Sequence, residues 1–497
     1  MNAPLTPVRF TPLERSSLAE RLRKELDAEV MFDAASRGRY ATDASIYQVE
    51  PIGIVVPRSE EAARGAIAIA VDEGVPILAR GAGSSQCGQA VGAALIIDHT
   101  KYLNRIVEIG AAHAVVQPGV VLDELNAELR KHGKWFPVDV STSAQATLGG
   151  MAGNNSCGSR SIEYGNMVHN VLAIEAVTAT GKRWRFGPMR DASGEYGEFV
   201  QRLARLYERE RAEIETRFPK VLRKVAGYNL DHLGPPHANA AHLLVGSEGT
   251  LAYSERLHLK LSPLPQKRAL GVCHFPKFYT AMDLTQHIVR LGPTAVELVD
   301  RTLVGLAREN PAFEKIVNAV IRGDPDAVLL VEFADARVGR LKDLVQLMAD
   351  LGLPGSVVEV PDEKLQKQIW EVRKAGLNIM MSMKGDGKPV SFIEDCAVPL
   401  EHLAEYTDRL TRVFEKHGTR GTWYAHASVG TLHVRPVLDM RRDGAAKMRA
   451  IAEEACAMVK EYKGAYSGEH GDGLVRSEWI APFFGPRLTA ALGEIKS

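Results

Sequence analysis

The sequence predicts an α+β fold with more than one domain. Short strand-like runs alternate with helical segments and with many of the 44 glycines, which is typical of small α+β units rather than of one doubly wound sheet. Pro263 and Pro265 interrupt this pattern and predict a domain boundary. The length of 497 residues is enough for about three domains. We expect a helical lead-in at 1–45, a first domain at 46–264 and a second domain at 265–497.

The elements of the first domain follow from periodicity and from end signals. Leucines at near-helical spacing predict an amphipathic helix over residues 12–35. Ser59, followed by Glu60 and Glu61, predicts the start of a helix that runs to residue 73. The charged run 195–220 predicts a helix whose outer face is solvated. The other expected elements are strands at 52–56, 75–79 and 93–98 and a helix at 122–132.

The second domain begins with another alternation of strands and helices. Apolar runs predict strands at 269–275, 295–298 and 327–333, and helical spacing predicts a helix at 279–291. The sequence has no internal repeat and no low-complexity segment. This part of the chain is therefore predicted to form an α+β layer.

Composition excludes several classes of protein. Lys plus Arg and Asp plus Glu both total 61, so the chain lacks the basic excess of a nucleic-acid-binding protein. The five cysteines form no C-x-x-C pair, which argues against an iron-sulfur cluster or structural zinc within this chain. No apolar run approaches eighteen residues, and the N-terminus has no signal-peptide core. We expect a cytoplasmic protein, with peripheral attachment at the inner face of a membrane and oligomerisation both left open.

A glycine-rich loop at 80–92, with the sequence RGAGSSQCGQAVG, lies between two predicted strands. Its glycines let backbone amides approach a ligand closely, and Ser84 and Ser85 add hydroxyl donors, which suits a phosphate or pyrophosphate. The spacing matches neither the P-loop nor the Rossmann G-x-G-x-x-G pattern. A solvated turn is the alternative interpretation.

A second glycine-rich stretch, ATLGGMAGNNSCG at 146–158, has few side chains large enough to build a core. A mobile loop is one interpretation. The concentration of short polar groups at Asn154, Asn155 and Ser156 favours a ligand-binding segment instead.

Three segments, RGAGSSQCG, TLGGMAGNNSCGSRSIEYG and VGSEGTLA, resemble the flavin-contacting segments of the FAD-linked oxidases of the vanillyl-alcohol oxidase type. Within that family the chain is most similar to the D-2-hydroxyacid dehydrogenases that act on D-lactate, D-2-hydroxyglutarate or glycolate, over residues 40–479. The resemblance implies a two-subdomain α+β FAD-binding domain and an α+β substrate cap domain. The loop lacks a histidine, and Cys87 does not fit a cysteinyl link, so we expect FAD to be bound non-covalently.

The resemblance also implies which residues contact FAD. They come from the two glycine-rich stretches and from the turn that precedes TLA. The candidates are Arg80, Gly81, Ala82, Gly83, Ser84, Ser85, Gly88, Gln89, Gly149, Gly150, Asn154, Ser156, Gly165, Glu248 and Gly249.

Two histidines and a glutamate form a candidate metal site. His426 and His433 are seven residues apart, an odd separation that puts them on opposite faces of a straight strand. The chain must therefore bend at 428–430 if both bind one ion. His, His and Glu are a ligand set for a divalent ion with an open position. The resemblance implies that His426, His433 and Glu469 hold zinc or manganese; Thr431 stands where relatives often carry Asn.

The resemblance assigns the remaining chemistry to three residues. His470 is the expected general base for the substrate hydroxyl. Arg373, on a predicted helix, and Lys388, at a predicted strand start, match the pair that binds the substrate carboxylate. The expected reaction is oxidation of a small 2-hydroxyacid by hydride transfer to the flavin, assisted by the metal.

Several questions remain open at this point. The substrate beyond its hydroxyacid group is not defined; Arg435 and Arg476 are candidates for binding a second carboxylate. The electron acceptor is unknown, and the motifs look most like relatives fused to an iron-sulfur half, so an iron-sulfur domain or a separate subunit is the expected partner. Two other functions compete: an ether-lipid synthase-like FAD enzyme, and a metal-dependent hydrolase if the metal motif is read alone.

Overall fold

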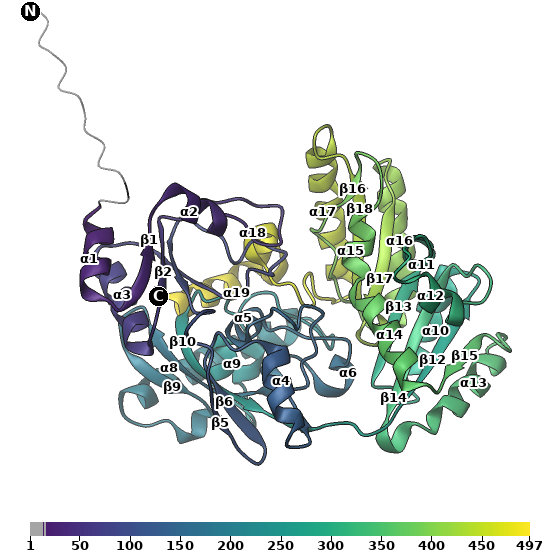
Figure 1. Ribbon diagram of the computed structural model, residues 1–497, viewed down its shortest axis with the longest axis horizontal. Coiled ribbons are helices and arrows are strands. Elements are labelled where there is room, and N and C mark those ends of the chain that lie inside the picture. Colours follow the sequence, from purple (N-terminus) through teal and green to yellow (C-terminus); the bar gives the residue numbers. More distant parts are fainter. Residues whose placement is uncertain (1–12, 14–15) are drawn as a thin grey trace, which may run out of the picture.

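The computed structural model describes residues 13 and 16–497 and has two lobes (Figure 1). The first lobe contains residues up to 264 together with the last two helices, α18 (Gly473–Arg476) and α19 (Ile480–Lys496). The second lobe, drawn mostly in green, contains residues 265–466. Among the described residues, no helix is both long and apolar enough to cross a lipid bilayer.

The first subdomain has a four-stranded sheet in the order β1-β2-β4-β3. Strands β2, β3 and β4 are parallel, and β1 pairs antiparallel with β2. Helix α3 begins at the predicted cap, where the Ser59 side chain accepts from the Ala62 amide. The elements are α1 (Ser17–Glu25), β1 (Ala28–Met31), α2 (Ala34–Tyr40), β2 (Gly53–Pro57), α3 (Glu60–Asp72), β3 (Ile77–Arg80) and β4 (Leu95–Asp98).

The single helix expected over residues 12–35 is wrong in its second half, and its first residues lie partly outside the described residues. Helix α1 ends at Glu25, and β1 follows as an edge strand. Residues 28–31 pair with β2 in a regular ladder. Pairing with a neighbouring strand overrides the local helical tendency of these residues, so the lead-in is part of the first sheet.

The second subdomain has a five-stranded sheet in the order β5-β6-β10-β8-β9. The predicted charged helix is α8, and its inner face is buried through Val200, Leu203 and Ile214 while its charged face is exposed. The elements are β5 (Ile106–Ile109), β6 (His113–Val116), α4 (Leu122–Arg130), β7 (Lys134–Trp135), α5 (Leu148–Asn154), α6 (Ser161–Tyr164), α7 (Met167–Asn170), β8 (Val171–Thr178), β9 (Arg183–Phe186), α8 (Gly194–Arg217), α9 (Ala241–Leu244), β10 (Ala252–Lys260) and β11 (Ser262–Pro263).

Three histidine rings make edge-to-face contacts in this subdomain, with centroids 5.7 Å apart for His169 and His232 and 5.6 Å apart for His232 and His242. Burial lowers the pKa of His232 to about 3, with Lys224 and the other histidines adding to the effect, and burial lowers the pKa of His242 to about 4. Both rings are therefore neutral in the folded protein at neutral pH.

These histidines predict acid sensitivity. A depressed pKa contributes stability that is complete above the unfolded value of about 6.5 and is lost as pH falls toward the folded value. Lowering the pH from 7 to 5 should cost about 2 kcal/mol of unfolding free energy for each of His232 and His242. Urea unfolding at both pH values checks this, and His232→Gln should reduce the total loss by about 2 kcal/mol. An unchanged pH slope in His232→Gln would contradict it.

The second lobe has a seven-stranded sheet in the order β15-β12-β14-β13-β17-β18-β16, antiparallel at each pairing. One face packs on α10, α13 and α16, and the other packs on α11, α12 and α14. The elements are β12 (Arg268–Phe275), α10 (Phe278–Val289), β13 (Ala295–Asp300), α11 (Arg301–Glu309), α12 (Glu314–Val320), β14 (Ala327–Ala334), α13 (Arg340–Asp350), β15 (Val357–Val360), α14 (Glu363–Lys374), α15 (Gly376–Met381), β16 (Lys388–Pro389), α16 (Leu403–Lys416), β17 (Gly421–His426), β18 (Thr431–Leu438) and α17 (Gly444–Glu461).

The end of the chain returns to the first lobe (Figure 1). Helix α19 packs on α8, where the rings of Phe218 and Phe484 lie 5.0 Å apart and Arg209 pairs with Glu494 at 2.5 Å. The segment between α17 and α18 therefore crosses from the second lobe to the first, and this crossing carries Glu469 and His470.

Candidate active site

A cavity of about 950 Å³ lies between the lobes. Its walls come from the loop after β3, from α5, from the turn before β10, from α14 and from the β17–β18 hairpin. The volume is at the upper end of the range for cofactor pockets. The predicted site residues that line the cavity are Gly81, Ala82, Gly83, Ser84, Ser85, Gln89, Gly149, Gly150, Asn154, Ser156, Glu248, Gly249, Arg373, His426, His433, Glu469 and His470.

Four predicted residues are not part of this lining. Arg80 donates to three backbone carbonyls, at 2.7 to 3.0 Å, and so fixes the loop. Gly88 and Gly165 have φ angles of 82° and 69°, and Gly165 ends α6. Lys388 donates from Nζ to the carbonyl of Met383 at 2.6 Å. These residues shape the walls, and direct ligand contact by them stays a prediction.

The glycine-rich stretch at 146–158 is ordered by a short helix, α5. Thr147 caps its N-terminus, and Asn155 ends it with a left-handed φ of 55°. Asn154 Nδ2 donates to the carbonyl of Glu469 at 2.7 Å. The glycines thus lie in a helix whose exposed backbone faces the cavity. The hydrogen bond from Asn154 connects this helix directly to the predicted catalytic motif.

The turn before β10 is also tied to that motif. Glu248 has a φ of 53°, and its carboxylate accepts from Gln89 Nε2 at 3.0 Å and from the amides of Asp472 and Gly473. Burial raises the pKa of Glu248, although these donors oppose the shift. Glu248 therefore joins the first glycine loop to the segment that follows His470.

The cavity walls fit a dinucleotide. A Cβ at Gly150 would touch only the Thr147 hydroxyl, at 3.2 Å, and a Cβ at Gly249 would meet nothing within 4 Å, so both backbones face open space. His99 lines the cavity, and both of its buried ring nitrogens lack a hydrogen-bond partner among the described residues. Accessible backbone and unpaired donors suit phosphate and ring contacts.

A sharp hairpin brings the two predicted metal-binding histidines together. Strand β17 ends at His426, a short turn follows, and Gly430 has a left-handed φ of 68° before β18 begins. His433 pairs with Tyr424 across the hairpin, which puts it on the same sheet face as His426. The bend expected at 428–430 is confirmed.

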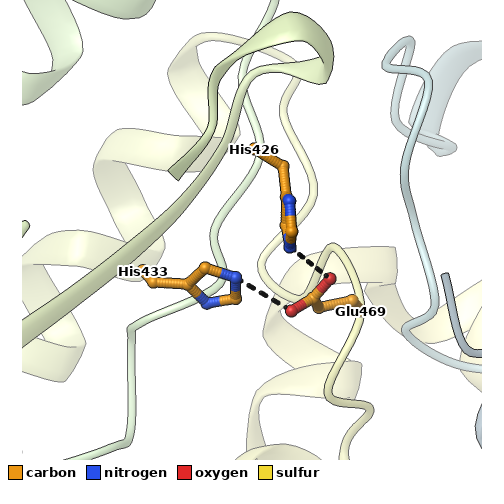
Figure 2. A group of neighbouring side chains, drawn as sticks. All are labelled: His426, His433 and Glu469. Atoms are coloured by element: carbon orange, nitrogen blue, oxygen red, sulfur yellow. Dashed lines mark ion pairs between the residues drawn. The ribbon is translucent and has the colours of Figure 1, made fainter. Parts of the chain in front are cut away.

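Figure 2 shows both rings pointing toward Glu469. His426 Nε2 lies 3.4 Å from Glu469 Oε2, and His433 Nε2 lies 3.0 Å from Glu469 Oε1. One ligand atom from each residue lies within 4.8 Å of the others, which suits a single divalent cation. Burial lowers the pKa of His433 well below its usual range, so its ring is in the neutral form that binds metals.

Buried charged residues orient these three side chains. His426 Nδ1 lies 2.7 Å from Glu297, which also pairs with Arg373 at 2.5 Å. Arg223, which is fully buried, pairs with Glu469 at 2.6 Å. Burial alone would raise the pKa of Glu469, but the two histidines and Arg223 outweigh it and lower that pKa well below its usual range. A carboxylate behind a histidine ligand is a common support of metal sites.

His470 is held by carboxylates on two sides. Its Nδ1 lies 2.6 Å from Glu394, and its Nε2 lies 3.1 Å from Glu469. The backbone amide of His470 donates to Asp395 at 2.7 Å. Burial lowers the pKa of His470, but Asp395, Glu394 and Glu469 outweigh it and raise the pKa to about 10. The ring is therefore an imidazolium at neutral pH when nothing is bound.

Arg373 and Lys388 differ in their surroundings. Arg373 is buried, lines the cavity and stacks over the ring of Tyr424 at 4.8 Å. Within the described residues its side chain has no hydrogen bond beyond the ion pair to Glu297. Arg373 is thus available to a substrate carboxylate, whereas the ammonium of Lys388 is directed to a backbone carbonyl.

The sequence did not single out Glu297, Glu394, Asp395 or Arg223. An acidic pair inside the apolar run FIEDCAV was a usable signal for Glu394 and Asp395, because buried carboxylates need partners. Glu297, also within an apolar strand, gave a weaker form of the same signal. Arg223 lies in a charged segment and gave none.

Gly430→Ala should distort the backbone of the candidate metal site. A Cβ there would come within 2.0 Å of the Val398 carbonyl oxygen, and the left-handed φ adds strain. We expect a loss of about 2 kcal/mol or more of stability and at least a tenfold weaker affinity for zinc or manganese, measured by thermal unfolding and metal titration. Gly418→Ala is the matched control: its φ is 64°, but a Cβ there would meet only Lys447 Nζ, at 3.9 Å. Equal metal affinity in both variants would contradict this prediction.

Comparison with known proteins decides the family. A sequence profile described as FAD binding domain matches residues 51–187, and one described as FAD linked oxidases, C-terminal domain, matches residues 264–497. The chain belongs to the FAD-linked oxidases. The family that the three glycine-rich motifs predicted is confirmed.

Relatives of this FAD-linked oxidase include several hydroxyacid dehydrogenases. D-2-hydroxyglutarate dehydrogenase of Escherichia coli is 33% identical over 494 residues, and the enzyme of Pantoea ananatis is 32% identical over 493. Each match covers 93% of this chain and 48% of the relative, so the chain spans about half the length of these relatives. Glycolate oxidase subunit GlcD of Bacillus subtilis is 25% identical, with 90% of this chain and 87% of the relative covered.

Solved structures confirm the predicted fold of the FAD-linked oxidase. p-Cresol methylhydroxylase with substrate bound matches with a TM-score of 0.70 and 15% identity, over 96% of this chain and 93% of the other. Alkyldihydroxyacetonephosphate synthase matches with a TM-score of 0.66 and 16% identity, over 96% and 82%. At this identity the likeness concerns the fold alone.

Proposed function

We propose that this FAD-linked oxidase is a dehydrogenase that oxidises a D-2-hydroxyacid to the corresponding 2-oxoacid. One observation supports this most strongly: His426, His433 and Glu469 converge with His470 and Arg373 on the cavity that the glycine-rich FAD-binding segments also line. A hydroxyacid has a carboxylate to be bound, a hydroxyl proton to be removed and a hydride to be transferred. In this proposal Arg373 binds the carboxylate, His470 takes the proton and FAD accepts the hydride. The names of the relatives support the same substrate class.

Two bound groups complete the proposal. FAD, held non-covalently by the glycine-rich segments, supplies the two-electron oxidant that accepts the substrate hydride. A divalent cation, zinc or manganese, held by His426, His433 and Glu469, supplies a Lewis acid for the substrate hydroxyl and carboxylate oxygens.

Arg373 orients the substrate. Its guanidinium is fixed between Glu297 and the face of Tyr424, so little rotational freedom is lost when it binds a carboxylate. Arg373 also links the carboxylate site to His426 through Glu297, which both residues contact. Lys388 is proposed as a second cation for the carboxylate and must leave the Met383 carbonyl to reach it.

His470 takes the hydroxyl proton. With Nδ1 directed to Glu394, the ring presents Nε2 to the cavity beside Glu469. The base must start as neutral imidazole, with the Nδ1 proton donated to Glu394, so that Nε2 is the atom that accepts the hydroxyl proton. After proton transfer the imidazolium is stabilised by Glu394 and Asp395.

The proposed partners follow from the family. We propose that the electrons pass to an iron-sulfur domain or subunit, that the protein acts in the cytoplasm or at the inner face of a membrane, and that nucleic acid is not a partner. Reoxidation of the reduced protein by a purified iron-sulfur partner would support the first point.

Anaerobic mixing with a panel of D-2-hydroxyacids tests the function. Bleaching of the flavin absorbance by one of them supports it, and release of FAD on acid precipitation supports non-covalent binding. Exchange of an acyl for an alkyl group without bleaching would favour an ether-lipid synthase-like enzyme. A colourless protein that hydrolyses esters or amides would favour a metal-dependent hydrolase.

A further inference from the structure

Arg435 is a buried guanidinium beside the histidines whose partners are all neutral. Its side chain is 0% exposed, and it lies on β18 two residues after His433. It donates to Ser391 Oγ at 2.8 Å, to Tyr424 Oη at 2.6 Å and to Gln86 Oε1 at 3.0 Å. Within the described part of the chain no ion pair joins Arg435 to a carboxylate, although Glu394 is near enough for its charge to interact with that of Arg435.

The other buried guanidiniums around the histidines are neutralised. Arg476 pairs with Asp395 at 2.6 Å and Glu394 at 2.9 Å, Arg373 pairs with Glu297, and Arg223 pairs with Glu469. A buried charge without a paired opposite charge is costly. Arg476 is thus neutralised by ion pairs and Arg435 is not, although both side chains are fully buried.

Arg435 lies directly behind the cavity wall. Two of its partners, Gln86 and Tyr424, line the cavity. The guanidiniums of Arg435 and Arg373 lie 5.2 Å and 4.8 Å from the centroid of the Tyr424 ring, and the ring of His433 lies 4.6 Å from it. Tyr424 is therefore a common neighbour of Arg435 and of the proposed carboxylate-binding residue Arg373.

We propose that Arg435 binds the second carboxylate of a dicarboxylic 2-hydroxyacid, and that the side-chain oxygen of Gln86 occupies that carboxylate's place in the ligand-free protein. This rests on the proposed function and narrows its substrate class. In a five-carbon dicarboxylate the terminal carbons lie roughly 5 Å apart, from C–C bonds of about 1.5 Å. Both guanidiniums lie within 5.2 Å of the centroid of the Tyr424 ring, so a molecule of that length can place one carboxylate at Arg373 and the other at Arg435.

Arg268 is another cation of the cavity wall, with no side-chain hydrogen bond or ion pair within the described residues, although the charges of Arg160, Glu332 and Asp139 act on it. It lies on β12, which is separated from β18, the strand of Arg435, by β14, β13 and β17. Strand spacing of about 4.8 Å puts its backbone roughly 19 Å from that of β18, so Arg268 belongs to a different part of the cavity wall. Arg268 is therefore the matched control for Arg435.

Substrate preference tests the proposal. Rates of FAD reduction are measured for D-2-hydroxyglutarate and for D-2-hydroxypentanoate, which has the same carbon number and no second carboxylate. Arg435→Gln should lower the kcat/KM ratio of the first to the second by about 100-fold or more, because the pocket then lacks the charge that the carboxylate needs. Arg435→Lys should lose less, and Arg268→Gln should leave the ratio unchanged. An unchanged ratio in Arg435→Gln overturns the proposal.

Gln86→Glu gives a second readout that does not depend on turnover. The new carboxylate should pair with Arg435 and raise the thermal unfolding temperature. It should also weaken the binding of glutarate by tenfold or more, and this binding is measured from the change that glutarate causes in the flavin spectrum. If Gln86→Glu retains FAD and binds glutarate with unchanged affinity, the proposal is overturned. This outcome can be read even if Arg435→Gln fails to fold. Failure of every hydroxyacid to bleach the wild-type flavin would instead overturn the proposed function.

Discussion

His470→Asn is expected to slow the reduction of FAD by a D-2-hydroxyacid by about 10²- to 10⁴-fold, the usual contribution of a positioned acid or base. Asparagine keeps a polar side chain of similar reach toward Glu394, so the local fold should survive, but it cannot accept the hydroxyl proton. Rapid mixing under anaerobic conditions measures the rate, and the absorbance of the purified variant checks that FAD is still bound.

The matched control is His417→Asn. His417 forms the same kind of histidine–carboxylate contact, with Glu454 at 2.7 Å, at the end of α16 and away from the cavity. This variant should reduce FAD at the wild-type rate. Near-normal reduction in His470→Asn would remove His470 from the role of base.

Glu469→Gln is expected to abolish tight binding of zinc or manganese and to destabilise the fold. The substitution removes an anionic ligand and leaves Arg223 buried without its counter-charge. Breaking a buried ion pair in this way costs about 3–5 kcal/mol. Metal analysis of the purified variant and denaturant unfolding measure the two effects.

Glu478→Gln controls for the general effect of removing a carboxylate. Glu478 pairs with Arg449 at 2.6 Å, and both side chains are more than half exposed. Its loss should change stability by less than about 1 kcal/mol. A Glu469→Gln protein with full metal content and unchanged stability would exclude Glu469 as a ligand.

Local signals in the sequence were enough for much of the fold. Ser59 capped its helix as predicted, and the requirement for a bend between His426 and His433 matched the turn at Gly430. In each case the determining residues lie within a few positions of one another. The strand at 28–31 was missed because its conformation depends on β2, more than twenty residues away.

The same distinction applies to the site. Motifs were enough to select the candidate metal-binding and catalytic side chains, because those residue types occur at family spacing, and their roles stay predictions. The supporting residues are distant in sequence: Arg223 reaches Glu469 across 246 positions, and Arg160 joins the lobes by pairing with Glu332 across 172. Only the folded chain shows such partners. The choice between Arg435 and Arg476 likewise depended on which one has carboxylates beside it.

The crossing of the chain end between the lobes divides the candidate metal site. His426 and His433 belong to the second lobe, whereas Glu469 is held to the first lobe by Arg223 and, through its carbonyl, by Asn154. A cation bound by all three would act as a clasp across the interface. If FAD enters or leaves when the lobes open, opening would move these ligands apart, so a bound cation should raise the affinity for FAD and, by reciprocity, bound FAD should raise the affinity for the cation by the same factor.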